Sequence, residues 1–80
     1  MQKKIIIYSM PNCIFCTNLK KWLVDNQISF EERCVTENEK FKQEFIELKG
    51  FGFPLILIQS KDKEHVITGF NQNSLESLLI

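Results

Sequence analysis

The chain has 80 residues, enough for one small hydrophobic core and too few for two, so we expect a single domain over residues 1–80. Hydrophobic residues make up 44% and charged residues 25%, the composition of an ordinary globular protein. The 10 basic and 10 acidic residues cancel, which argues against nucleic-acid binding and against a polybasic membrane patch. No apolar run approaches the roughly 18 residues of a membrane span. We therefore expect a cytoplasmic chain, whose thiols stay reduced.

The first half of the chain predicts a strand, a helix and a second strand. Residues 4–8 are apolar after the first position and rich in β-branched side chains, which is typical of a central strand buried on both faces. From Cys13 onward a helix is predicted that ends near residues 25–27. Its apolar positions share one face: Phe15, Leu19, Trp22 and Leu23. Residues 28–36 indicate a second strand, and such a β-α-β unit predicts parallel strands joined by a right-handed crossover.

The second half predicts a helix, a hairpin and a short last helix. Residues 36–39 offer helix-capping chemistry and Gly50 is a natural stop. The apolar positions between them recur at helical spacing: Phe41, Phe45 and Leu48. The other segments follow in order: a connector at 51–54, an apolar strand at 55–58, a polar turn at 60–64, a strand at 65–68, and a cap at 69–73 before the last helix.

Two cysteines stand where the first strand gives way to the first helix. Cys13 and Cys16 lie one turn apart, close enough to form and break a disulfide with little backbone movement. The first helical turn carries N–H groups without intrahelical partners, and their partial positive charge stabilises a thiolate. We therefore expect Cys13 to be the nucleophile and Cys16 the resolving thiol. The alternatives are an inert pair or half of a metal site, but a zinc site needs about four ligands and only Cys34 and His65 remain as candidates. We expect no metal.

The order of elements and motifs resembles the glutaredoxin-like branch of the thioredoxin superfamily, and most of all the small NrdH-redoxins. The resemblance covers essentially the whole chain: the cysteine pair after the first strand, Phe53-Pro54 before the third, and Gly69-Phe70 before the last helix. It implies an α/β thioredoxin-like fold, with a four-stranded mixed sheet in spatial order 2-1-3-4 and helices on both faces. It also implies a cis bond before Pro54, with Phe53, Pro54, Gly69 and Phe70 forming the substrate-binding surface beside the cysteines.

The same resemblance implies a dithiol–disulfide oxidoreductase that needs no cofactor. Glutaredoxins that use glutathione carry Thr-Val-Pro at the proline loop and Gly-Gly followed by acidic residues before the last helix. This chain has Gly-Phe-Pro at the first place and Gly-Phe-Asn-Gln-Asn at the second, so its glutathione site is poorly formed. We expect thioredoxin reductase as the reductant, ribonucleotide reductase among the acceptors, and a monomer. The alternatives are a glutathione-dependent glutaredoxin, a metal or iron–sulfur module, and a redox-inactive adaptor.

Four further side chains have competing interpretations. Lys20 either stabilises a thiolate or forms a solvated helix face with Lys21. Cys34 lies on the predicted sheet edge, where it either forms a regulatory disulfide or packs as a small hydrophobe, and we favour packing. His65 follows a charged turn and is expected to be solvated. Phe70 is the best candidate for an exposed aromatic ring near the cysteines, because it lies in a loop outside any periodic stripe.

Overall fold

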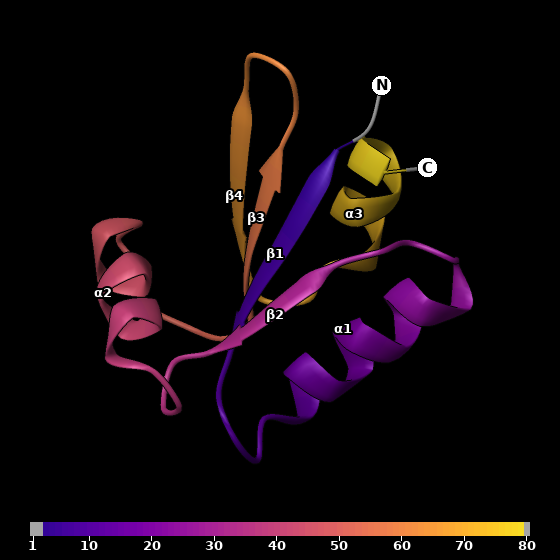
Figure 1. Cartoon of the computed structure of the whole chain (residues 1–80). Coiled ribbons are helices and arrows are strands. Elements are labelled where there is room, and N and C mark those ends of the chain that lie inside the picture. The colour runs from indigo at the N-terminus through magenta and orange to yellow at the C-terminus, as the bar shows by residue number, and fades with distance from the viewer. Residues whose placement is uncertain (1–2, 80) are drawn as a thin grey trace.

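The structure is a computed structural model that describes residues 3–79, in which four strands form one sheet with helices on both faces (Figure 1). Within these residues the elements follow the predicted order: β1 Lys4–Ser9, α1 Ile14–Asp25, β2 Glu31–Cys34, α2 Glu39–Glu47, β3 Leu55–Gln59, β4 Glu64–Thr68 and α3 Gln72–Leu79. The strands lie in spatial order β2-β1-β3-β4, with β1 parallel to β2 and all other pairs antiparallel. The predicted thioredoxin-like fold is therefore confirmed. Across residues 3–79, no helix has the length and hydrophobicity needed to cross a membrane.

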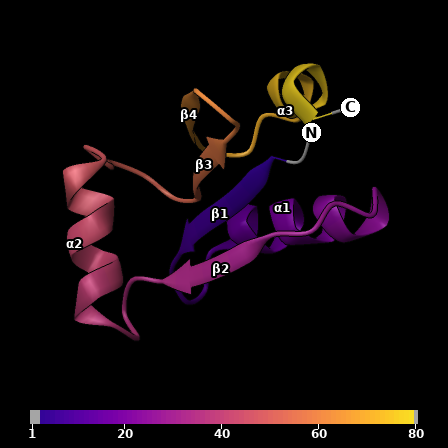
Figure 2. The same ribbon diagram turned by 45° about the horizontal axis from the view of Figure 1, so that its top comes forward.

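The central strand β1 builds a core on each face of the sheet, because successive side chains of a strand point to opposite sides. Ile5 and Ile7 face α1 and α3, and Figures 1 and 2 show these two helices on the same side of the sheet. Their buried neighbours come from β3 and both helices: Leu19, Leu23, Ile56, Ile58 and Leu75. Ile6 and Tyr8 face the opposite side, which α2 covers with partly buried apolar side chains. The strand is apolar throughout because both of its faces are covered.

The C-terminal end of α2 differs from the prediction that Gly50 stops the helix. Lys49, and not the glycine after it, adopts the left-handed conformation, with a φ of 61°. Its N–H bonds to the Ile46 carbonyl at 2.9 Å, and the Gly50 N–H bonds to the Phe45 carbonyl at 2.9 Å. This pair of bonds caps the free carbonyls of the last turn. Gly50 is needed for a different reason, since a Cβ there would lie 2.4 Å from ring atoms of Phe45.

The second strand is shorter than the sequence predicted. β2 has four residues, whereas the pattern indicated a strand over 28–36. Ile28 and Phe30 are partly buried and pack against the core from the connection that precedes β2, so their apolar character reflects packing and not strand pairing. At the far end, the Glu37 N–H bonds to the Cys34 carbonyl at 3.1 Å and turns the chain away from the sheet.

The register of the sheet brings the loops that carry the predicted site to one end of the strands. Tyr8 of β1 is the partner of Leu55 in β3, and Leu55 is the partner of Thr68 in β4. On the other side of β1, Ser9 is the partner of Cys34 in β2. Four segments therefore meet at the same end of the sheet's strands: the loop that leaves β1, the start of β3, and the last residues of β4 and β2.

Candidate redox site

Cys13 is the N-cap residue of α1. Its backbone is extended, with φ −105° and ψ 106°, and its Sγ accepts a hydrogen bond from the Cys16 N–H at 3.2 Å. Asn12 has a left-handed φ of 59°, which turns the chain from β1 into the helix. The Cys13 sulfur therefore lies at the end of the helix where unpaired N–H groups favour negative charge.

Cys16 occupies the first turn of α1 and is almost fully enclosed, with 2% of its surface exposed. Burial raises the pKa of the Cys16 thiol to about 12, and the hydrogen bond and charge of Cys13 add to this effect. The Met10 backbone and the Lys20 charge oppose it. Cys13, in contrast, is only partly buried, and both cysteines are free thiols. A nucleophile and a resolving thiol need this difference in exposure.

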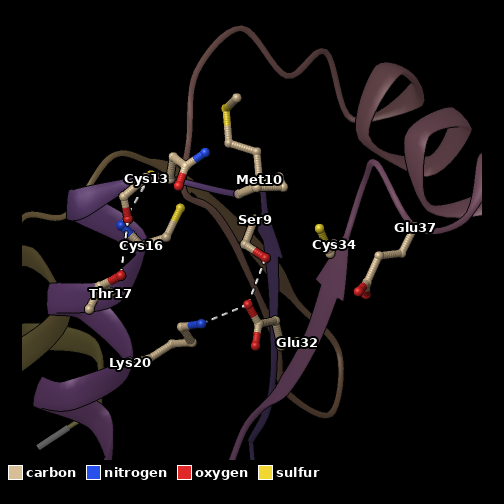
Figure 3. Close-up of a pocket in the computed structure, with 11 residues that line it drawn as sticks. Ser9, Met10, Cys13, Cys16, Thr17, Lys20, Glu32, Cys34 and Glu37 are labelled. Atoms are coloured by element: carbon tan, nitrogen blue, oxygen red, sulfur yellow. Dashed lines mark hydrogen bonds and ion pairs between the residues drawn. The ribbon is translucent and has the colours of Figure 1, made fainter.

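A cavity of about 380 Å³ opens beside the cysteine pair on its β2 side (Figure 3). Its lining comes from the β1–α1 loop, α1, β2 and the following turn: Ser9, Met10, Pro11, Asn12, Cys13, Cys16, Thr17, Lys20, Glu32, Cys34 and Glu37. Cys34 lies on the edge strand, as predicted. Its thiol is partly buried and lies 3.2 Å from the Thr36 Oγ1, so it lines a polar cavity and does not pack into the apolar core as we favoured.

Three polar side chains from three elements meet in the wall of this cavity. The Ser9 Oγ of β1 donates to the Glu32 Oε2 at 2.7 Å, and the Lys20 Nζ of α1 donates to the same oxygen at 2.8 Å (Figure 3). Both bonds lower the pKa of the Glu32 carboxyl, the Lys20 bond most. Of these three residues, only Lys20 was a candidate from the sequence, and Ser9 and Glu32 were missed. The one indication of this cluster in the sequence was the four-residue spacing from Cys16 to Lys20, which places both residues on one helix face.

The predicted substrate-binding residues lie on the other side of β1. The peptide bond between Phe53 and Pro54 is cis, as the resemblance implied. The Gly69 N–H donates to the Pro54 carbonyl at 2.7 Å, which holds the β4–α3 loop against the proline loop. Gly69 has a φ of 82°, which favours glycine. These residues do not line the cavity beside Cys34.

The aromatic rings of these two loops are partly buried, and each contacts another aromatic ring. Phe70, predicted to be exposed, is partly buried against the core, and its ring centroid lies 6.3 Å from that of Trp22. The Phe53 ring stacks on Phe45 with centroids 4.6 Å apart. The prediction of an exposed Phe70 ring was therefore wrong, because the loop folds back onto α1. Two other phenylalanines are exposed: Phe15 at 59% and Phe51 at 86%.

The comparisons with known proteins agree with this arrangement. The glutaredoxin family model matches residues 5–66 of the chain. The chain belongs to the glutaredoxin family. It is 32% identical over 74 residues to the glutaredoxin-like protein NrdH of Lactococcus lactis subsp. lactis (strain IL1403), a match that covers 92% of this chain and 97% of that protein. The predicted resemblance to NrdH-like proteins is thereby confirmed.

Solved structures place this glutaredoxin-family chain in the same fold. The thioredoxin-like protein BC3987 is 25% identical, with a TM-score of 0.82 and coverage of 94% of this chain and 99% of that one. The glutaredoxin-like protein NrdH-redoxin from Escherichia coli is 22% identical, with a TM-score of 0.72 and coverage of 94% and 93%. The second likeness shows a shared fold.

The other predicted candidates lie apart from the site. Within residues 3–79, no three histidine, cysteine or acidic side chains are grouped so that they could hold a metal ion. His65 is exposed on β4, where its partner in the sheet is Ile58, and its predicted solvation is confirmed. The site itself consists of two thiols of unequal exposure beside a polar cavity.

Proposed function

We propose that this chain is a dithiol–disulfide oxidoreductase that delivers two electrons to protein disulfides through Cys13 and Cys16. The observation that carries the proposal is the asymmetry of the pair in a glutaredoxin-family fold. The Cys13 sulfur caps α1 and is partly exposed, while Cys16 lies behind it with 2% of its surface exposed. An exposed thiol attacks first, and a buried neighbour one turn away then displaces the product.

The exchange proceeds in two steps that balance electrons and protons. The Cys13 thiolate attacks one sulfur of the substrate disulfide, forms a mixed disulfide, and releases the other substrate sulfur as a thiolate that takes a proton. Cys16 then loses its proton and attacks the Cys13 sulfur. The second substrate thiolate leaves, and the Cys13–Cys16 disulfide remains. The substrate has gained two electrons and two protons, and the protein must be reduced before it can act again.

The substrate is proposed to dock on the side of Cys13 that carries the proline loop. The Gly69 N–H bonds to the Pro54 carbonyl at 2.7 Å, which holds the two loops side by side. Pro54 itself is fully buried, so of the four predicted residues it cannot contact a substrate directly. We propose that an extended substrate segment contacts the partly buried residues around it, mainly through the backbone of Phe53 and Gly69. An extended segment can pair with such a surface through main-chain hydrogen bonds.

Thioredoxin reductase is the proposed reductant, in preference to glutathione. The residues at the junction between the loop and α3 carry amide side chains where glutathione-using glutaredoxins carry acidic ones, and two of these amides are hydrogen-bonded within α3 and its start. The Asn71 Oδ1 accepts from the Ser74 N–H at 3.1 Å, and the Gln72 amide donates to Glu76 at 3.1 Å. The Escherichia coli NrdH-redoxin is described as having a thioredoxin-like activity profile. Ribonucleotide reductase is the proposed acceptor, and we place this electron transfer in the cytoplasm, with residues 1–80 acting as one monomeric unit.

The reductant is tested by NADPH consumption with the oxidised protein. One arm contains thioredoxin reductase, and the other contains glutathione with glutathione reductase. We expect consumption in the thioredoxin reductase arm, complete loss in Cys13→Ser, and retention in the matched variant Cys34→Ser. Consumption only in the glutathione arm would overturn the proposed reductant, while no consumption in either arm would overturn the oxidoreductase itself.

The acceptor is tested separately with the reduced protein. Single-turnover reduction of insulin disulfides reports the general reaction, and deoxyribonucleotide formation by a disulfide-dependent ribonucleotide reductase reports the specific one. We expect both reactions to require Cys13 and Cys16. Activity on insulin without activity on the reductase would contradict the proposed acceptor but leave the chemistry in place.

A further inference from the structure

The proposed reaction requires Cys16 to become a thiolate at the second step, although it is buried. Two groups favour this thiolate by lowering the pKa of Cys16: a hydrogen bond from the Met10 backbone and the positive charge of the Lys20 ammonium. The other titratable groups that line the same cavity are Cys13 on its own helix and, from the β2 side, Glu32, Cys34 and Glu37; their side-chain functions are thiols or carboxyls. Lys20 is therefore the one cation in the described lining of this cavity.

The position of Lys20 is fixed by the neighbouring strands. Its Nζ lies 2.8 Å from the Glu32 Oε2, and the buried Ser9 hydroxyl donates to that same oxygen at 2.7 Å. The two ion-pair partners are about one-third exposed, at 33% and 36%, so solvent weakens the attraction but does not remove it. Lys20 follows Cys16 by four positions on α1, which puts the two residues about one turn apart on the same helix face, and both line the same cavity.

We propose that Lys20, held by Glu32 and Ser9, is a positioning residue whose charge favours the Cys16 thiolate during the attack on the mixed disulfide, and that Glu32 limits how much of that charge reaches Cys16. This inference rests on the proposed function. It assigns to Lys20 an effect on the second step of the exchange, with the first step left to the helix N-terminus.

The alternative in which Glu32 removes the proton from Cys16 is less favourable. A general base works best when its pKa lies near the operating pH. The bonds from Lys20 and Ser9 lower the pKa of Glu32, which makes this carboxylate a weak base. A carboxylate paired in this way acts as a fixed negative charge that holds Lys20 and offsets part of its field.

The two steps are separable with 4,4′-dithiodipyridine, a neutral disulfide that releases a coloured thione. The parent for this experiment is Cys34→Ser, which removes the third thiol. With the probe in excess, the attack by Cys13 depends on probe concentration, whereas displacement by Cys16 is unimolecular and does not. Stopped-flow absorbance therefore gives both rates, and Cys16→Ser identifies the unimolecular phase by abolishing it.

We expect Lys20→Met to slow the unimolecular phase by roughly threefold for each unit by which the pKa of Cys16 rises. At a given pH below that pKa, a one-unit rise lowers the thiolate fraction tenfold, but the more basic thiolate is roughly threefold more nucleophilic. The rate profile of this phase should move to higher pH in Lys20→Met and to lower pH in Glu32→Gln. Lys20→Arg, which keeps the charge, should restore the parent profile.

Lys21→Met is the matched control, because it removes an exposed lysine from the same helix. It should leave the unimolecular phase unchanged. The inference is overturned if Lys20→Met resembles Lys21→Met, if it slows both phases equally, or if Glu32→Gln slows the unimolecular phase. Absence of that phase in the parent would instead refute the proposed function, and the inference with it.

Discussion

The enclosure of Cys16 predicts how the stability of the protein changes with pH. Its pKa is raised in the folded state to about 12 from an ordinary value of 9.0, mainly by burial. In the unfolded chain the thiol is exposed and titrates near the ordinary value. Between these two pH values the unfolded state binds fewer protons than the folded state, so the free energy of unfolding falls as pH rises. Below about pH 8 the effect vanishes, because the thiol is protonated in both states.

The magnitude at pH 10 follows from these two values. One group with such pKa values lowers the free energy of unfolding by about 1.4 kcal/mol between neutral pH and pH 10, about a tenfold change in the folding equilibrium. Burial also raises the pKa of Tyr8, which destabilises the fold in the same direction at still higher pH. The Cys16 contribution is therefore the difference between the wild type and Cys16→Ala, and not the total loss of stability.

Urea unfolding at pH 7, 9 and 10 in the presence of a phosphine reductant measures this difference. Cys16→Ala is expected to be less stable than the wild type at pH 7, with a gap that narrows by about 1.4 kcal/mol at pH 10. Cys34→Ala, which removes a partly buried thiol from the same cavity, is the control and should retain the loss of stability that is attributed to Cys16. Parallel losses in wild type and Cys16→Ala would refute the argument that burial holds Cys16 protonated.

Four further substitutions test the packing described above, each by urea unfolding. Lys49→Gly should stabilise the protein by about 0.5–1 kcal/mol, since glycine relieves the left-handed backbone at this position. Gly50→Ala should destabilise it by about 1–3 kcal/mol, because the added Cβ meets the Phe45 ring; an unchanged midpoint would contradict that contact. Phe70→Ala should destabilise by about 2 kcal/mol while Phe51→Ala, which truncates an 86% exposed ring, leaves the midpoint within about 0.5 kcal/mol.

Local patterns predicted the fold well where a single physical cause determined them. The apolar run of β1 identified a strand covered on both faces, and both predicted faces are present. The second strand was overestimated because Ile28 and Phe30 are apolar for packing against the core, a tertiary contact that has no period in the sequence. Similarly, Gly50 marked the end of α2 but for the wrong reason, since the close approach of Phe45 is not visible from spacing.

The residues of the candidate site also separate into those that local patterns predict and those that depend on contacts between distant segments. Cys13 and Cys16 were found from their spacing and from their place between a strand and a helix, both of which are local. Ser9 and Glu32 were missed because their meeting depends on the register of β2 against β1, which a β-α-β pattern leaves undetermined. Lys20 was only partly predictable, because its helical spacing from Cys16 is local but its partner Glu32 comes from β2.

The partly buried rings of Phe53 and Phe70 limit what the proposed substrate recognition on the proline side can depend on. Each ring is held by another aromatic ring, Phe45 in α2 and Trp22 in α1, so moving either one outward would expose apolar surface and lose packing. The loops are thus anchored from opposite faces of the sheet, and the bond between Gly69 and Pro54 joins them. In the proposed docking mode these loops present the backbone of Phe53 and Gly69 in a fixed position, which suits partners recognised by their main chain more than by their side chains.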